Sequence, residues 1–231
     1  MSISENIADI RRRIDAAARE TGRTGEEITL VGASKMNDAA VCQEAVAAGI
    51  DALGENRVQE MTAKIEQGAY AGAQLHFIGH LQRNKVRQVV GKVALIQSAG
   101  SEALLRVIEK EAAKADLVQP VLLEVNIGGE EAKSGFLPDE VRSAAQMAKE
   151  LPHVEVQGLM TIPPVQTREH ENVPYFQKVY ALYVDINKEI YDNNLKYISM
   201  GMSGDFEDAI RCGSNMVRVG TAIFGRRIYA K

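Results

Sequence analysis

The sequence predicts an α/β protein in which eight parallel strands close into a TIM-like (β/α)8 barrel, with one extra helix at the N-terminus. Short apolar runs alternate with amphipathic helical stretches along the chain, and eight such runs can be counted. Their starts lie about 20 to 40 residues apart, which is the size of a strand–helix unit. We therefore expect a single domain that covers residues 1–231.

The extra helix comes first in the chain. Its apolar residues Ile3, Ile7 and Ile10 recur at helical spacing, and Ser2 with Glu5 forms the pattern of a capping box. The eight expected strands follow, at Ile28–Ala33, Ala52–Gly54, Leu75–Gly79, Ala94–Ser98, Pro120–Asn126, Val154–Thr161, Tyr197–Gly201 and Met216–Gly220.

Helices are expected between these strands. Gly49 and Gly68 follow helical stretches as C-caps do, and Pro138 and Pro174 stand where a helix can begin. The expected ranges are Asp38–Ala48, Arg57–Gln67, Asn84–Val90, Glu102–Ala115, Asp139–Leu151, Pro174–Tyr191 and Asp205–Cys212. A longer connection, Ile162–Val173, follows the sixth strand and is either a lid over the barrel mouth or an inert surface loop.

An open doubly wound sheet is the alternative architecture. The sequence has no G-x-G-x-x-G or P-loop pattern after any expected strand. The barrel is therefore the better prediction.

Composition narrows the class of protein. The chain is 45% hydrophobic and carries a net charge of -4, which gives no general attraction to nucleic acid. Cys42 and Cys212 are the two cysteines, and neither has a neighbour at metal-ligand spacing, so we expect no disulfide framework and no metal site. The segment Met1–Glu5 does not resemble a signal peptide, and no apolar stretch could span a bilayer. We expect a soluble, cytoplasmic monomer without membrane partners.

Lys35 is the first candidate for chemistry, because it follows the first expected strand directly. Strand side chains alternate, so Val31, Ala33 and Lys35 share one face. In apolar surroundings a lysine pKa falls, and the neutral amine can attack a carbonyl to form a Schiff base. The alternative is a strand-end lysine whose amine reaches into solvent.

Two loops are candidates for binding a phosphate group. In barrels of this type, phosphate often binds after the seventh and eighth strands. Here those loops contain Ser203 and Gly204, and Gly220 and Thr221. Their backbone N–H groups and hydroxyls suit an anion. Ordinary helix capping by Asp205 is the alternative, and the acidic residues at 205, 207 and 208 count against an anion.

A reactive lysine facing a phosphate site suggests a phosphorylated aldehyde, and pyridoxal 5′-phosphate meets that requirement. Arg218 then lies near the ring, where its donor-only guanidinium would keep the pyridine nitrogen unprotonated. An ion pair between Arg218 and a carboxylate on a neighbouring strand is the other interpretation.

With these residues in place, the sequence resembles the pyridoxal phosphate homeostasis protein family, whose barrel is related to the N-terminal domain of alanine racemase. The resemblance covers nearly the whole chain and is carried by the segments 31–35, 54–60, 76–85, 124–126, 158–160, 199–205 and 218–225. It implies a barrel of pyridoxal phosphate fold type III. It also implies Lys35 as the Schiff-base lysine, Ser203, Gly204, Gly220 and Thr221 on the phosphate, Arg218 at the pyridine nitrogen, and Asn56 and Met200 as pocket-lining residues.

The roles of three further residues, His76, His80 and Lys133, have more than one interpretation. His76 and His80 lie on a strand and its exit loop, so their spacing does not favour a metal pair. His80 could approach the cofactor. Lys133 is either a second amine that exchanges the aldehyde or part of a charged surface loop with Glu130 and Glu131.

Three functions compete. The favoured one is a non-enzymatic protein that buffers pyridoxal phosphate or delivers it to apo-enzymes. The second is a small enzyme such as an amino-acid racemase, which needs an opposite-face base that related racemases take from a further C-terminal domain; a chain ending at Lys231 is expected to lack one. The third is a barrel enzyme acting on a phosphorylated sugar, which would carry no chromophore.

Overall fold

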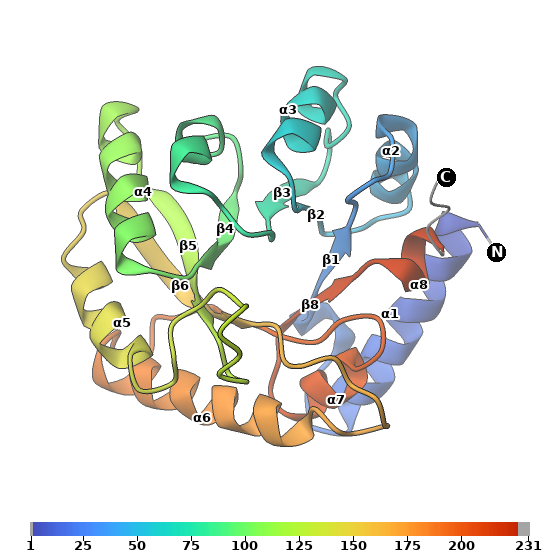
Figure 1. The fold of residues 1–231 in the computed structure, drawn as a ribbon. Helices are drawn as coiled ribbons and strands as arrows, with labels where there is room; N and C mark the ends of the chain where they lie inside the picture. The colour runs from blue at the N-terminus through green and yellow to red at the C-terminus, as the bar shows by residue number, and fades with distance from the viewer. Residues whose placement is uncertain (1, 226–231) are drawn as a thin grey trace.

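The computed structural model describes residues 2–225, which form a closed barrel of eight parallel strands surrounded by helices (Figure 1). The strands pair in chain order, and β8 closes the barrel against β1. The strands are β1 (Thr29–Ala33), β2 (Ala52–Glu55), β3 (Gln74–Phe77), β4 (Leu95–Ala99), β5 (Gln119–Val125), β6 (Val154–Thr161), β7 (Tyr197–Ser199) and β8 (Met216–Val219). All eight expected strands are confirmed, with ends that shift by one or two residues at most.

Most of the expected helices are also present. They are α1 (Ile3–Arg19), α2 (Ala39–Ala47), α3 (Val58–Glu66), α4 (Glu102–Lys114), α5 (Val141–Lys149), α6 (Val173–Glu189), α7 (Phe206–Arg211) and α8 (Thr221–Phe224). The capping box at the start of α1 is confirmed, because the Ser2 hydroxyl accepts from the Glu5 N–H and the Glu5 carboxylate accepts from the Ser2 N–H. Gly49 and Gly68 follow α2 and α3 with φ of +82° and +66°, as C-cap glycines do.

Two helix predictions need correction. The expected α-helix Asn84–Val90 is a 3-10 helix, η2 (Arg83–Gln88), which is followed by the buried Val89. Val86 and Val89 are three residues apart, so the three-residue turn of a 3-10 helix places both against the core. The helix expected from Asp139 begins at Val141, because Pro138 and Asp139 lie in the preceding turn.

The N-terminal helix α1 completes the outer ring of helices. Helix α8 after β8 has a single turn, and α1 packs beside α7 and α8 in the same region (Figure 1). The Asn6 side chain donates to the carbonyl of Ile223 and so ties the two helices together. A second 3-10 helix, η1 (Gly25–Glu27), leads from α1 into β1.

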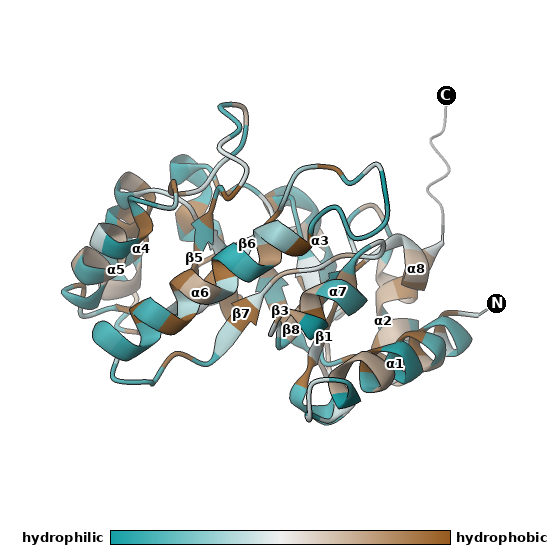
Figure 2. Ribbon diagram, turned by 90° about the horizontal axis from the view of Figure 1, so that it is seen from below, coloured by the Kyte–Doolittle hydropathy of each residue, from teal (hydrophilic) through white to brown (hydrophobic). Residues whose placement is uncertain are grey.

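Strand alternation divides the core into two clusters. One lies between the strands and the helices, and the helices turn their apolar side toward it (Figure 2). The other fills the barrel interior with Val31, Ala52, Ile78, Leu95, Leu122, Met160 and Met216. Leu30 belongs to the first cluster and Val31 to the second, as the predicted alternation requires. Apolar side chains fill the barrel interior. The polar side chains of the candidate site lie near the carboxyl ends of the strands.

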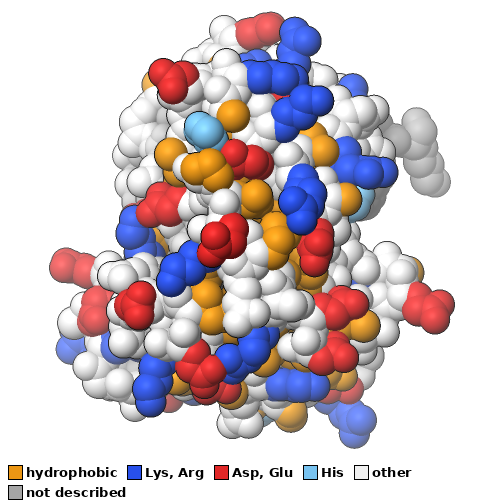
Figure 3. All heavy atoms as spheres, turned by 90° about the vertical axis from the view of Figure 1, so that its left-hand side faces the viewer, with side chains coloured by type: hydrophobic (Ala, Val, Ile, Leu, Met, Phe, Trp, Pro, Cys, Tyr) orange, Lys and Arg blue, Asp and Glu red, His pale blue; other side chains and the backbone are white. Residues whose placement is uncertain are grey.

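The outer surface mixes charges of both signs. On the face over α4 and α5, acidic and basic side chains are interspersed (Figure 3). Within residues 2–225, no helix combines the length and apolar character needed to cross a membrane.

Candidate functional site

Lys35 lies just beyond the carboxyl end of β1, in a turn that leads to α2. Its side chain is half-buried, and Ala33, two residues earlier, packs against the barrel interior. A Cβ added to Gly220 would lie 3.4 Å from the Ala33 Cβ, so the loop after β8 passes directly over this small residue. The structure therefore brings the end of β1 and one of the two predicted phosphate loops together.

A buried polar cluster on the other side of β1 holds the peptide that precedes Lys35. Lys64 Nζ donates to the Ser34 carbonyl at 2.9 Å and to Glu55 Oε1 at 2.6 Å. The same carboxylate oxygen accepts from Ser34 Oγ at 2.6 Å and from Tyr70 OH at 3.0 Å. Burial raises the pKa of Tyr70, so its phenol stays a neutral donor. We call Ser34, Glu55, Lys64 and Tyr70 the Glu55 cluster; it fixes where the chain leaves β1.

Arg218 lies inside the barrel and is held by two hydrogen bonds. Nη1 donates to Ser199 Oγ at 2.5 Å, and Nη2 donates to the Thr161 carbonyl at 2.7 Å. Arg218 makes no ion pair with any residue in the range 2–225, so the predicted alternative of a carboxylate partner on a neighbouring strand is wrong. Burial lowers the pKa of Arg218 to about 10, against the opposing effect of Asp205 and Glu124, and the guanidinium remains charged near neutral pH.

A chain of hydrogen bonds runs from Arg218 across the interior to β3. Because arginine can only donate, Ser199 must accept from Arg218, and it donates in turn to Gln97 Oε1 at 2.7 Å. The Gln97 amide nitrogen then faces His76 Nδ1 at 3.0 Å, so that nitrogen accepts and the ring carries its proton on Nε2. Burial lowers the pKa of His76 to about 4, which keeps the ring neutral and this direction intact.

The two predicted phosphate loops meet through Ser203. Its Oγ accepts from the Gly220 N–H at 3.2 Å and from the Ala222 N–H at 3.5 Å. Because both contacts use the hydroxyl as an acceptor, its hydrogen is left to donate to a ligand. The N–H groups of Ser203, Gly204 and Thr221 have no acceptor within the described part of the chain.

The acidic residues beside these loops are turned to other partners. Asp205 occupies the N-cap position of α7, but its side chain makes no capping bond there; it accepts instead from the Met202 N–H at 2.7 Å and from Asn172 Nδ2 at 2.8 Å. Glu207 forms a two-point pair with Arg13, and Asp208 contacts His170 and Arg211. The sequence-based objection to an anion here therefore loses its force.

Asn56 and Met200 have different positions. Asn56 follows β2, and its Oδ1 is buried without a hydrogen-bond partner among the described residues. A Cβ on Gly79 would lie 2.4 Å from the Asn56 carbonyl oxygen, so only glycine lets the two loops approach this closely. Met200 is fully buried in the helix-facing cluster, which makes its backbone the part nearer the barrel mouth. That each of them lines a ligand pocket stays a prediction.

His80 and Lys133 lie on the β3 and β5 side of the mouth. His80 Nδ1 contacts Ser134 Oγ at 2.8 Å, and Lys133 Nζ contacts Glu130 and the Pro163 carbonyl. His76 points into the barrel and His80 into the loop after β5, so they do not form a pair. The segment Ile162–Val173 spans the mouth, because Pro163 binds Lys133 and Gln166 donates to the Gly204 carbonyl.

Several residues of the site were not anticipated. Ser199 accepts from Arg218, Gln97 accepts in turn from Ser199, and Lys64 donates to the carbonyl of the peptide that joins Ser34 to Lys35. The sequence feature that could have revealed Ser199 is strand alternation. Ser199 and Arg218 each lie two residues after an interior residue, Tyr197 and Met216, and so face the barrel interior too. For Lys64 the signal was a charge on the buried face of α3, three residues after the buried Met61.

The fold and the site together are those of the alanine racemase N-terminal domain class. Residues 5–227 match the family model of the alanine racemase N-terminal domain. Alanine racemase from Clostridium difficile 630 shares the fold at a TM-score of 0.72 and 16% identity, over 95% of this chain and 57% of that one.

The chain belongs to the pyridoxal phosphate homeostasis protein family. It is 42% identical to the pyridoxal phosphate homeostasis protein of Aquifex aeolicus, over 99% of this chain and 100% of the relative. It is 36% identical to the Escherichia coli K12 protein of the same name, over 99% and 98% of the two chains. The structure of PipY from Synechococcus elongatus with pyridoxal phosphate bound aligns at a TM-score of 0.83 and 29% identity, over 97% of this chain and all of PipY.

Proposed function

We propose that this protein binds pyridoxal 5′-phosphate, buffers it and delivers it to apo-enzymes in the cytoplasm, acting as a monomer. In this proposal the Lys35 amine would form a Schiff base with the aldehyde carbon, with release of water, and Ser203, Gly204, Gly220 and Thr221 would bind the phosphate. Arg218 would face the pyridine nitrogen. The names of the relatives and the bound cofactor in PipY support the proposal.

The described residues fit this group. The phosphate needs hydrogen-bond donors without competing carboxylates, and the loops at Ser203 and Thr221 offer free N–H groups beside acidic residues that are already paired. Of the five N–H donors of Arg218, three have no acceptor within residues 2–225. The buried Asn56 Oδ1 adds an acceptor that awaits a partner.

The position of Arg218 is the observation that carries the proposal. Bound pyridoxal phosphate supplies an aldehyde that reacts with primary amines and a ring that can accept electrons. Arg218 stays charged and can only donate, so beside the ring nitrogen it would keep that nitrogen unprotonated and weaken the ring as an electron acceptor. This favours storage and transfer of the cofactor over catalysis on amino acids.

An absorbance spectrum of the purified protein, taken before and after borohydride and followed by peptide mapping, tests the proposal. We expect a chromophore that borohydride abolishes and an adduct on the peptide containing Lys35. Lys35→Ala should lack the chromophore, whereas Lys133→Ala should keep it. An adduct on Lys133 with Lys35 unmodified would refute the assignment.

A second assay separates storage from catalysis. Incubation with apo-enzymes should transfer the cofactor to them, and a racemase and transaminase panel should stay near background. Turnover of any amino acid at the roughly 1 to 1000 per second usual for enzymes, dependent on Lys35, would replace the storage proposal with an enzymatic one.

A further inference from the structure

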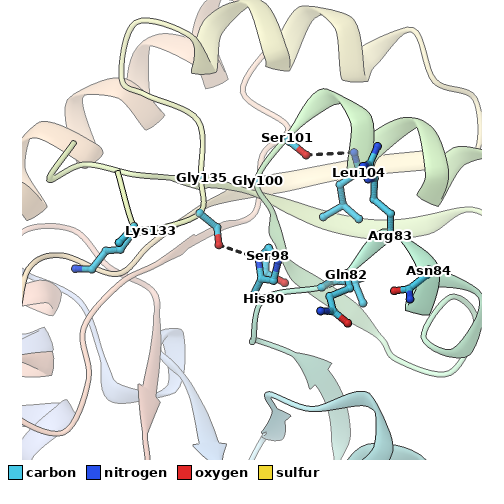
Figure 4. A pocket seen from close by; sticks show the side chains of 13 residues that line it. His80, Gln82, Arg83, Asn84, Ser98, Gly100, Ser101, Leu104, Lys133 and Gly135 are labelled. Carbon is cyan, nitrogen blue, oxygen red and sulfur yellow. Dashed lines mark hydrogen bonds between the residues drawn. The ribbon is translucent and has the colours of Figure 1, made fainter. Parts of the chain in front are cut away.

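A pocket of about 860 Å³ opens beside the barrel mouth, over the carboxyl ends of β3, β4 and β5 (Figure 4). The loop after β3 and the start of η2 form one wall, and the loop after β5 forms another. Between them lies the segment that joins β4 to α4. The lining includes His80, Gln82, Arg83, Asn84, Ser98 and Gly100.

Two buried oxygen atoms near the floor of this pocket lack partners. Ser98 lines the pocket and is 3% exposed, and its Oγ has no hydrogen-bond partner. Glu124 is 8% exposed, and its Oε2 is equally without a partner among the described residues. Buried polar atoms in folded proteins are nearly always satisfied, so two such oxygens on adjacent strands point to a missing ligand.

The glycines of the wall allow the Glu124 carboxylate to reach it. Ala99 of β4 is in register with Leu123 of β5, which puts Gly100 beside Glu124. A Cβ on Gly100 would lie 2.9 Å from Glu124 Oε2 and 2.9 Å from the Gly135 nitrogen. Gly100 and Gly135 both line the pocket, so the carboxylate lies directly behind its wall.

The charges around the pocket select the ligand. The lining offers the Ser98 hydroxyl oxygen, and the Glu124 carboxylate lies directly behind Gly100. Together these two acceptors suit the three donors of an ammonium group. The rim offers Arg83, which is exposed and forms no ion pair within residues 2–225, together with the amides of Gln82 and Asn84. Such a rim suits a carboxylate. Lys133 also lines the pocket, but its Nζ contacts Glu130 and the Pro163 carbonyl.

We propose that this pocket binds a small primary amine of the amino-acid type, with its ammonium group on Glu124 and Ser98 and its carboxylate toward Arg83. Lys133 of the pocket wall donates to the Pro163 carbonyl, and Gln166 of the same segment donates to the Gly204 carbonyl, so one segment links the pocket to the proposed cofactor site. The bound amine would then stand next to the cofactor held by Lys35. That role rests on the proposed function, whereas binding of the amine does not.

Calorimetric titration of the purified protein with glycine and with N-acetylglycine tests the proposal. We expect saturable binding of glycine and none of N-acetylglycine, which keeps the carboxylate but blocks the amine. In Glu124→Gln, which preserves shape and removes the charge, glycine should bind about 10- to 100-fold more weakly, the range for a lost hydrogen bond to a charged group. The control Glu131→Gln, on the exposed loop after β5, should bind as the parent does.

Further arms separate this proposal from the cofactor proposal and from folding defects. Lys35→Ala should bind glycine as the parent does; if binding disappears, the signal came from the cofactor and the pocket proposal fails. If Glu124→Gln does not fold, Ser98→Ala takes its place, and glycine should shift the amide NMR resonances of Gly100 and Gly135 in the parent. Equal affinity in Glu124→Gln or Ser98→Ala, equal binding of both titrants, or no saturable binding would overturn the proposal. A protein without chromophore that still binds glycine would remove the cofactor proposal alone.

Discussion

Two buried polar regions of the molecule, the Glu55 cluster and the barrel mouth, differ in how many of their polar atoms have hydrogen-bond partners. In the Glu55 cluster, one carboxylate oxygen accepts from Ser34, Lys64 and Tyr70. At the mouth, Ser98 Oγ, Glu124 Oε2 and Asn56 Oδ1 have no partner in the described structure. The side chains of the two regions are similarly buried, so the regions differ in their hydrogen bonds. The Glu55 cluster, whose hydrogen bonds meet on one carboxylate, holds the backbone, whereas side chains with unpaired polar atoms are available to a ligand.

Even the Glu55 cluster contains one unmet atom, Glu55 Oε2. Its other oxygen carries three donors, so the charge is still compensated by Lys64. The contrast therefore concerns whole side chains: those of Ser98 and Glu124 make no hydrogen bond within residues 2–225, while every member of the Glu55 cluster makes at least one.

Removing Lys64 should give the largest effect, because it leaves Glu55 as a buried charge without a counterion. We expect Lys64→Met to lower the free energy of unfolding by about 3 to 5 kcal/mol, the range for breaking a buried pair. Urea denaturation measures this. The ion pair of the exposed Lys114 with Glu111 is the control, since Lys114→Met should cost much less than Lys64→Met. Equal losses in the two variants would contradict the structural role of the cluster.

Glu124 should make stability depend on pH in the opposite sense to an ordinary surface carboxyl. Burial raises its pKa from 4.5 to about 7, against the opposing effect of Arg218. The folded protein therefore keeps the proton longer than the unfolded chain does, and stability falls as pH rises from about 4.5 to about 7. The loss should be of the order of 2 to 3 kcal/mol.

His76 acts in the same pH range with the opposite sign, because its pKa is lowered from 6.5 to about 4. As the pH falls, the unfolded chain protonates this histidine before the folded protein does, so protonation favours the unfolded state. The effect of Glu124 is therefore measured as the difference between the parent and Glu124→Gln, by urea denaturation at pH 5 and pH 8 without added cofactor. A difference that does not change between these pH values would show that the Glu124 pKa is not raised.

Loss of hydroxyls in the phosphate loops should affect binding and leave folding intact. We expect Ser203→Ala or Thr221→Val to weaken pyridoxal phosphate binding by about 1 to 3 kcal/mol, because each removes a hydrogen bond to a charged group. Fluorescence titration gives the dissociation constants, and Ser143→Ala on the exposed side of α5 is the control. An unchanged dissociation constant in the double variant would remove the proposed phosphate site.

The sequence revealed the barrel because its evidence is periodic. Eight apolar runs at regular spacing need a sheet that buries all of them, and alternation placed Val31 and Ala33 inside. Lys35, Ser203 and Gly220 could be found because the ends of barrel strands meet at one mouth. The hydrogen bonds of Ser199, Gln97 and Lys64 could not be predicted, because they join residues that are far apart in the sequence and belong to different strands and helices. The 3-10 form of η2 was missed because a short valine-rich segment fits either helix.

The smallest effect offers the most direct comparison, because the same substitution can be made in both regions. Ser34 and Ser98 are 0% and 3% exposed. Ser34→Ala removes a donor from the buried Glu55 carboxylate and should cost about 1.5 kcal/mol. Ser98→Ala removes a hydroxyl that has no partner, so stability should change by less than about 0.5 kcal/mol or rise slightly. Paired urea denaturation curves decide the matter. A loss at Ser98 equal to that at Ser34 would show that its hydroxyl is already satisfied in the folded protein, and the contrast between the closed cluster and the open mouth would then disappear.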